Sequence, residues 1–228
     1  MKISLVRAIA EITIVVAAFY MSLVWLSTAI SPYASPFGML GGVVAALLFI
    51  GLRGERFSEF GFRPVGLRAT AIIVITLIAL AFAIFIVLEP HLESLFGPVD
   101  LSIFNPLEGD TSLYLWMLAA SWIGAAFGEE VVYRGFIMTR IAQVFSLSMS
   151  GWIIAIFMQA LIFAVMHSYQ NTAGMIEVFL YAIALGVAYL AGGRSLWPVI
   201  VAHGLVDTIA MTDFYQGGVI TNQFIQFR

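Results

Sequence analysis

Residues 69–88 read ATAIIVITLIALAFAIFIVL, a stretch in which no side chain carries a charge. A helix that crosses the hydrocarbon core of a bilayer needs about 20 mostly apolar residues, so this stretch predicts a transmembrane span. An open strand cannot cross lipid, because its backbone polar groups would have no hydrogen-bond partners there. We therefore interpret the stretch as a helix.

Similar apolar stretches lie on both sides of it, at about residues 8–30, 37–52, 112–139, 152–166, 175–191 and 196–211. Apolar residues make up 62% of the 228-residue chain and charged residues only 10%. A soluble domain could not cover so much apolar surface with so few polar groups. The sequence predicts an all-α polytopic transmembrane helix bundle of about seven or eight spans, folded as a single domain over residues 1–228 and in contact with membrane lipid.

Charge is distributed unequally between the loops. Basic residues precede the first span and follow the second: Lys2, Arg7, Arg53, Arg56, Arg63 and Arg68. The loop after residue 88 carries acidic residues and no Lys or Arg. Because cytoplasmic loops are enriched in Lys and Arg, this pattern predicts a cytoplasmic N-terminus. Short loops favour a prokaryotic cell membrane.

Two polar features near the predicted cytoplasmic face are also interpreted from the sequence. Arg7 and Glu11 are four residues apart and are predicted to form a snorkelling pair at the interface. The linker at residues 53–68 is predicted to lie in the headgroup zone with Phe57, Phe60 and Phe62.

Composition excludes several kinds of function. The net charge of −3 gives no reason to expect a nucleic-acid partner. The chain has no cysteine, which excludes disulfides, a thiol nucleophile and thiolate metal ligands.

Ionisable residues inside the predicted spans gather in three short strings: EEVVYRGF at 129–136, FAVMH at 163–167 and HGLVD at 203–207. Each charged group placed in hydrocarbon costs about 2.5–3.5 kcal/mol on insertion scales, so each of these residues needs a reason to be there. We therefore interpret the three strings as a candidate functional site.

Spacing assigns different surroundings to the two adjacent glutamates. Glu130 and Arg134 are four residues apart and share a helix face, so they are expected to pair. Glu129 points about 100° away and shares its face with Tyr133. Two carboxylates in a poor dielectric should not both ionise freely, so Glu129 is the candidate general base. The Glu130–Arg134 pair either takes part in the chemistry or only holds the site together.

The histidine strings supply the remaining candidate groups. His203 and Asp207 are also four residues apart, so Asp207 could orient the imidazole or act on substrate itself. With His167 and the glutamates, these groups could activate water for hydrolysis. Glu129, His167 and His203 would also make a common zinc set, so one divalent metal and a metal-free mechanism both stay open.

The three strings, in this order on successive apolar segments, resemble the CPBP family, the CAAX-processing and bacteriocin-processing (Abi) intramembrane proteases. The family patterns E-E-x-x-x-R, F-x-x-x-H and H-x-x-x-[N/D] fall on Glu129 to Arg134, Phe163 to His167 and His203 to Asp207. The motif core spans about residues 112–207. At position 207 this chain has Asp where many members have Asn.

The resemblance implies an endopeptidase that hydrolyses a peptide bond of a membrane-associated substrate, a prenylated CAAX protein in eukaryotic members. It also implies that residues 129, 130, 134, 167, 203 and 207 form the catalytic site, in a polar cavity. Because one full span would separate His167 from His203, this requires either that the helix before His167 end deep in the membrane or that residues 168–174 dip inward. Two other functions stay open: a proton-coupled transporter, whose ionisable groups would line a path, and a catalytically silent membrane partner.

Overall fold

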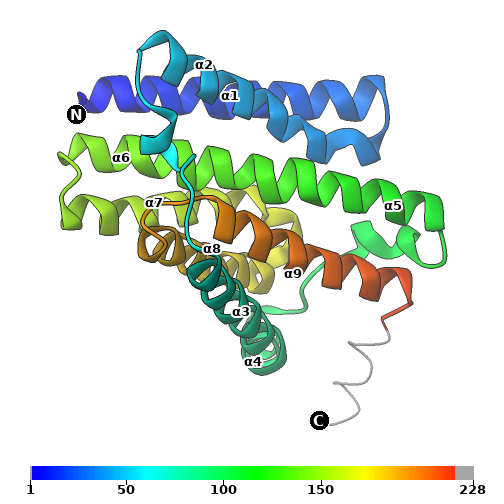
Figure 1. Ribbon diagram of the computed structural model, residues 1–228. Coiled ribbons are helices and arrows are strands. Elements are labelled where there is room, and N and C mark those ends of the chain that lie inside the picture. The colour runs from blue at the N-terminus through cyan, green and yellow to red at the C-terminus, as the bar shows by residue number, and fades with distance from the viewer. Residues whose placement is uncertain (1, 219–228) are drawn as a thin grey trace.

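The computed structural model describes residues 2–218, and the ends of the predicted single domain, residue 1 and residues 219–228, lie outside them (Figure 1). The described chain is helical, and the division into one domain stays a prediction. The helices in chain order are α1 (Leu5–Ala29), η1 (Pro32–Gly38), α2 (Met39–Leu52), η2 (Phe57–Phe60), α3 (Leu67–Ala83), η3 (Ile84–Leu88), α4 (Glu89–Phe96), η4 (Ser102–Leu107), α5 (Thr111–Ala120), η5 (Ser121–Ile137), α6 (Met138–Val144), α7 (Met149–Met166), η6 (Ser168–Gln170), α8 (Asn171–Ala191) and α9 (Trp197–Tyr215).

The predicted all-α polytopic bundle is confirmed. Six helical segments of the described chain are long and apolar enough to cross a membrane: Leu5–Ala29, Pro32–Leu52, Leu67–Phe96, Thr111–Val144, Met149–Met166 and Ser168–Ala191. The helix α9 has 19 residues, but its three ionisable side chains, His203, Asp207 and Asp213, lower its mean hydropathy. With α9 the bundle has seven long helices among the described residues, and Thr111–Val144 runs as one continuous helical segment.

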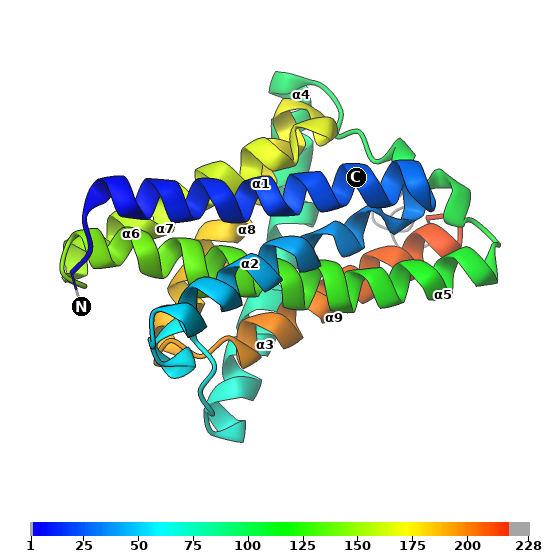
Figure 2. The same cartoon turned by 90° about the horizontal axis from the view of Figure 1, so that it is seen from above.

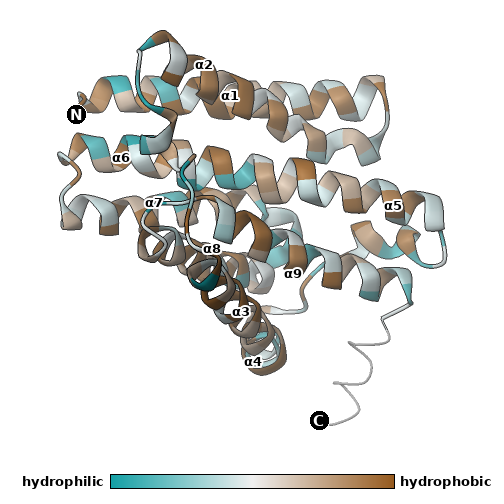
Figure 3. Ribbon diagram, viewed as in Figure 1, coloured by the Kyte–Doolittle hydropathy of each residue, from teal (hydrophilic) through white to brown (hydrophobic). Residues whose placement is uncertain are grey.

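The helices differ in direction. In Figures 1 and 2, α1, α2 and the continuous helix α5–η5–α6 run along one another, whereas α3 and α4 cross them steeply. α3 packs on α9, and α4 packs on α8. In Figure 3 most of α3 is brown, and hydrophilic colour is concentrated in the linker after α2 and along α6. The bundle therefore combines apolar spans with polar segments.

Local sequence signals explain where several helices begin. Asp110 accepts a hydrogen bond from the Leu113 backbone N–H at 2.9 Å and caps α5, and Ser148 caps α7 through Gly151 at 3.1 Å. Side-chain acceptors at these positions satisfy N–H groups that the first turn leaves without partners. Pro198 occupies the first turn of α9, where its missing N–H costs nothing. These caps fix the ends of the helices that carry the candidate site.

A buried cluster of charged residues joins α1 to α6. Glu11 is 2% exposed and pairs with Arg7 at 2.8 Å, with Arg53 at 2.5 Å and with Arg140 at 2.7 Å. The guanidinium of Arg140, itself fully buried, also pairs with Glu55 at 2.6 Å. The prediction that Arg7 and Glu11 form a snorkelling pair is therefore wrong about Glu11, because the distant residues Arg53 and Arg140 enclose it.

The linker between α2 and α3 folds back onto the helices of the candidate site. Phe60 is fully buried and stacks at 6.0 Å on Phe136 of η5. The Leu196 backbone N–H, just before α9, donates to the Gly61 carbonyl at 3.0 Å. Gly61 has φ +97°, a conformation that favours glycine. The prediction that Phe60 lies among the headgroups is therefore wrong, since this residue is buried against η5.

A close backbone approach joins η5 to η1. A Cβ atom at Gly124 would collide with the backbone carbonyl of Pro36. We expect Gly124→Ala to lower the free energy of unfolding by about 1–3 kcal/mol, because neither backbone can move aside. Thermal unfolding of the purified protein in detergent measures this loss.

The matched control is Gly51→Ala in α2. A Cβ atom at Gly51 meets nothing within 4 Å, so this variant should be as stable as the parent or slightly more stable. Equal unfolding temperatures for the two variants would contradict the close packing of η5 on η1.

Candidate active site

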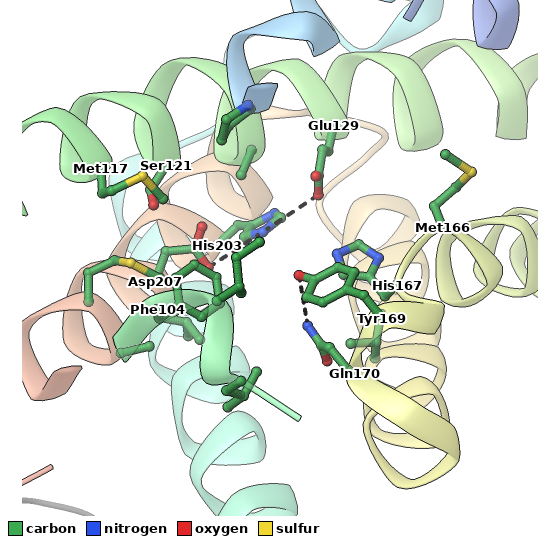
Figure 4. A pocket seen from close by; sticks show the side chains of 18 of the residues that line it. Phe104, Met117, Ser121, Glu129, Met166, His167, Tyr169, Gln170, His203 and Asp207 are labelled. Carbon is green, nitrogen blue, oxygen red and sulfur yellow. Dashed lines mark hydrogen bonds and ion pairs between the residues drawn. The ribbon is translucent and has the colours of Figure 1, made fainter. Parts of the chain in front are cut away.

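A cavity of about 480 Å³ opens between the helices, and the predicted site residues Glu129, His167, His203 and Asp207 all line it (Figure 4). These side chains come from three elements: η5, the end of α7, and α9. Residues far apart in the sequence thus converge on one space.

The two adjacent glutamates face different surroundings, as their spacing predicted. The Glu129 side chain is 16% exposed and lines the cavity with Tyr133, one turn along the same helix. Glu130 is fully buried behind the cavity wall. Both lie in η5, a π-helical stretch, and such stretches occur frequently at functional sites. Only Glu129 is therefore placed to touch a molecule in the cavity.

The Glu130 carboxylate holds two other site residues. Its Oε1 accepts a hydrogen bond from Arg134 Nη1 at 2.8 Å and another from His203 Nδ1 at 2.8 Å. Both interactions are enclosed, since Glu130 and Arg134 have no exposed surface. A charge-assisted pair in such a poor dielectric is strong but fixes its geometry tightly. Glu130 therefore ties η5 to α9.

Arg134 is bound by several helices at once. Besides Glu130, its Nη2 donates to the Ala182 carbonyl of α8 at 3.4 Å, and its guanidinium lies 4.7 Å from the centre of the Phe163 ring. Phe163 meets the Tyr133 ring edge to face at 4.8 Å. Arg134 is thus the buried centre of contacts between η5, α7 and α8.

His203 presents its second nitrogen to two carboxylates. With Nδ1–H donating to Glu130, Nε2 lies 3.7 Å from Asp207 Oδ1 and 3.9 Å from Glu129 Oε2. These distances exceed a direct hydrogen bond, so Nε2 is free to donate to or accept from a group in the cavity. Figure 4 shows the dashed lines from His203 toward Glu129 and Asp207.

His167 lies where α7 ends, at the level of the cavity. Its Nδ1–H donates to the Phe163 carbonyl of the preceding turn at 2.9 Å, which leaves Nε2 as an acceptor. The short helix η6 then turns the chain into α8, and its Tyr169 and Gln170 line the same cavity. The end of α7 and the packing of α9 on η5 bring both histidines to one cavity.

The donor set does not fit a metal ion in this arrangement. Glu129, His167 and His203 were predicted as candidate ligands, yet no group of three or more His, Asp and Glu side chains within residues 2–218 is arranged to hold a metal. The described residues therefore contain no preformed three-ligand metal site.

The cavity also has walls that the sequence motifs did not indicate. The N-terminal half contributes apolar residues from α1, η1, α2, η3 and η4, among them Phe19, Tyr33, Met39, Phe85 and Phe104. These residues have no short-range pattern that distinguishes them from lipid-facing ones, so the sequence offered no signal. The cavity is thus polar on one side and apolar on the other.

One comparison with known families finds a match. Residues 111–209 match the family model described as type II CAAX prenyl endopeptidase Rce1-like. No curated protein and no solved structure was found to match the chain. The matched residues contain all three motifs and span α5 to α9, which together supply the polar side of the cavity. Residues 111–209 of this membrane-embedded chain are therefore similar to the Rce1-like type II CAAX prenyl endopeptidases, which agrees with the CPBP family that the motifs resemble.

Proposed function

We propose that the protein is an intramembrane endopeptidase that hydrolyses a peptide bond with water activated by Glu129. The observation that supports this most strongly is the convergence of Glu129, His167, His203 and Asp207 on one cavity inside a helix bundle. The Rce1-like family is one of proteases, which agrees with hydrolysis.

The geometry suggests a role for each group. Water held between the Glu129 carboxylate and the bare Nε2 of His167 gives a proton to Glu129 and attacks the peptide carbonyl carbon. The charged form of His203 donates from Nε2 to the developing oxyanion, while its Nδ1–H keeps the hydrogen bond to Glu130. The C–N bond then breaks, and Glu129 returns its proton to the leaving amine. Asp207, 3.7 Å from Nε2, stabilises the charged imidazole.

Two other functions are less well supported. A proton-coupled transporter would distribute its ionisable groups along a path across the bilayer, whereas here they surround one point. A catalytically silent membrane partner would not need an open cavity beside an intact set of polar side chains.

The substrate class follows from the family and the cavity. A membrane-associated peptide or lipidated protein fits a site with one polar and one apolar wall. We propose a prenylated CAAX-type peptide as the first substrate to test.

The orientation stays a proposal, with the N-terminus in the cytoplasm of a prokaryotic cell. Contacts of Arg53 and Arg140 with Glu11, and of Arg63 with the Gly193 carbonyl, gather basic residues at one end of the bundle. The acidic residues from Glu93 to Asp110 take no part in these contacts of the basic end. The Asp100 carboxylate accepts from the Ser102 hydroxyl at 2.6 Å and from its backbone N–H, which lowers its pKa and keeps it ionised. Such asymmetry supports a cytoplasmic basic end.

Cleavage by the purified protein in liposomes tests the proposed function. A labelled prenylated CAAX peptide and a library of membrane peptides are incubated with it, and products are identified by mass spectrometry. Cleavage at a defined bond supports the proposal. Failure to cleave any member of the library would favour the transporter or silent-partner function.

Removal of metal should leave cleavage unchanged. Because Glu129, His167 and His203 do not form a metal-binding group, we expect protein dialysed against a strong chelator to keep its initial rate. Added Zn²⁺ should not raise that rate. A loss on chelation that Zn²⁺ restores would contradict the metal-free mechanism.

A further inference from the structure

A second polar feature lies in the cavity wall, on α8. Glu177 and Tyr181 are four residues apart, so they share one helix face, and both line the cavity. Glu177 Oε1 and the Tyr181 hydroxyl are buried, and neither has a hydrogen-bond partner among residues 2–218. Buried polar groups in proteins are nearly always hydrogen-bonded, so these two oxygen atoms lack a hydrogen-bonding ligand.

The charges around Glu177 indicate that its missing partner is a cation. Glu89 and Glu93 of α4, which packs on α8, lie near enough to repel a negative charge on Glu177. No described residue lining the cavity is a lysine or arginine, although Glu129, Glu177 and Asp207 are all carboxylic acids. The nearest guanidinium, that of Arg134, is fully buried and committed to Glu130.

The stretch of chain that leads to Glu129 has the same sign. Between Arg68 and Arg134 the sequence contains no Lys or Arg but contains seven acidic residues: Glu89, Glu93, Asp100, Glu108, Asp110, Glu129 and Glu130. Of these, Glu129 lines the cavity, together with Glu177 and Asp207. A cavity lined by one sign of charge attracts ligands of the other sign and raises their local concentration.

We propose that Glu177 and Tyr181 form a subsite for a basic side chain of the peptide substrate. A lysine ammonium has three donors and no acceptor, and it would donate to Glu177 Oε1 and to the Tyr181 oxygen together. Glu177 would thus be a specificity-determining residue for the endopeptidase. The identity of the bound peptide as a substrate rests on the proposed function.

Geometry places this subsite close to the scissile bond. Ala182, next to Tyr181, accepts a hydrogen bond from Arg134, which binds Glu130 directly. Glu177 lies four residues before Tyr181 in α8, which at 1.5 Å per residue is a rise of about 6 Å. An extended peptide advances about 3.3–3.6 Å per residue, so the basic residue would lie within a few residues of the bond that is cut.

Peptide binding tests the subsite without requiring cleavage. A short apolar host peptide, fluorescently labelled and amidated at its C-terminus, carries a single lysine that is moved one position at a time. Each lysine peptide has a twin with norleucine at the same position. Binding to the Glu129→Gln protein in nanodiscs of zwitterionic lipid is measured by fluorescence anisotropy, so that turnover and lipid charge do not interfere.

At one or two positions the lysine peptide should bind at least about tenfold more tightly than its twin, a factor that corresponds to about 1.4 kcal/mol. Adding Glu177→Gln should remove this preference, whereas Glu177→Asp should keep part of it. Adding Glu108→Gln removes the same charge from an exposed position outside the cavity, so the preference should persist. Far-UV circular dichroism and thermal unfolding check that each variant is folded.

Equal binding of both twins at every position, or no binding of any lysine peptide, would overturn the subsite. So would a preference that survives Glu177→Gln. Cleavage by the parent protein is recorded separately: a lysine preference without cleavage supports the subsite and argues against the proposed endopeptidase. Cleavage without a lysine preference does the reverse.

Discussion

Glu129→Gln should reduce the rate of peptide cleavage by about 10²–10⁴-fold, the contribution that general bases typically make. The amide cannot accept the proton of the attacking water, yet it keeps the size of the side chain. Glu129 lines the cavity and pairs with no basic residue closer than the His203 nitrogen at 3.9 Å. The variant should therefore fold normally and bind peptide as the parent protein does. Initial rates in liposomes, together with peptide binding, measure the two properties separately.

Glu108→Gln is the matched control, because Glu108 is exposed and lies outside the cavity. Its rate should equal that of the parent. If Glu129→Gln cleaved peptide at the parent rate, the assignment of the base would be wrong, whatever the identity of the substrate.

Replacing Glu130 by leucine should have the largest effect on stability. The substitution leaves the buried guanidinium of Arg134 without its carboxylate and removes the acceptor of His203 Nδ1. Removing one partner of a buried ion pair typically costs about 3–5 kcal/mol, because the other charge stays buried and uncompensated. Chemical unfolding in detergent micelles, followed by tryptophan fluorescence, gives the loss.

A double-mutant cycle separates this cost from the loss of packing. Glu130→Leu combined with Arg134→Met should be more stable than the sum of the two single losses predicts, because no unpaired charge remains. Exposed Glu108→Leu should change stability by no more than about 0.5 kcal/mol. Additive losses in the cycle would show that Glu130 and Arg134 do not stabilise each other.

The sequence predicted those features that depend on short-range spacing. The apolar stretch at 69–88 marked α3, and the four-residue spacing of Glu130 and Arg134 correctly predicted their pairing. The adjacent position of Glu129 correctly predicted a different surrounding. Spacing sufficed in these cases because a single helix fixes the relative positions of its own side chains.

Features that depend on packing between distant helices could not be predicted. Glu11, Glu55 and Arg140 are far apart in the sequence, so nothing in their spacing showed that they meet in a buried cluster. Phe60 looked like an interfacial residue because the linker around it is polar, yet it lies under Arg140 and against Phe136. The apolar wall of the cavity could not be predicted for a similar reason, since lipid-facing and cavity-facing residues are equally apolar.

The division of the polar residues among η5, α7 and α9 has a consequence for biosynthesis. The nascent chain emerges with Glu129 first, His167 next, and His203 and Asp207 in the last helix described. Until α9 enters the bilayer, Glu130 has no imidazole to hold. Under the proposed mechanism, hydrolysis therefore begins only once α9 has been inserted.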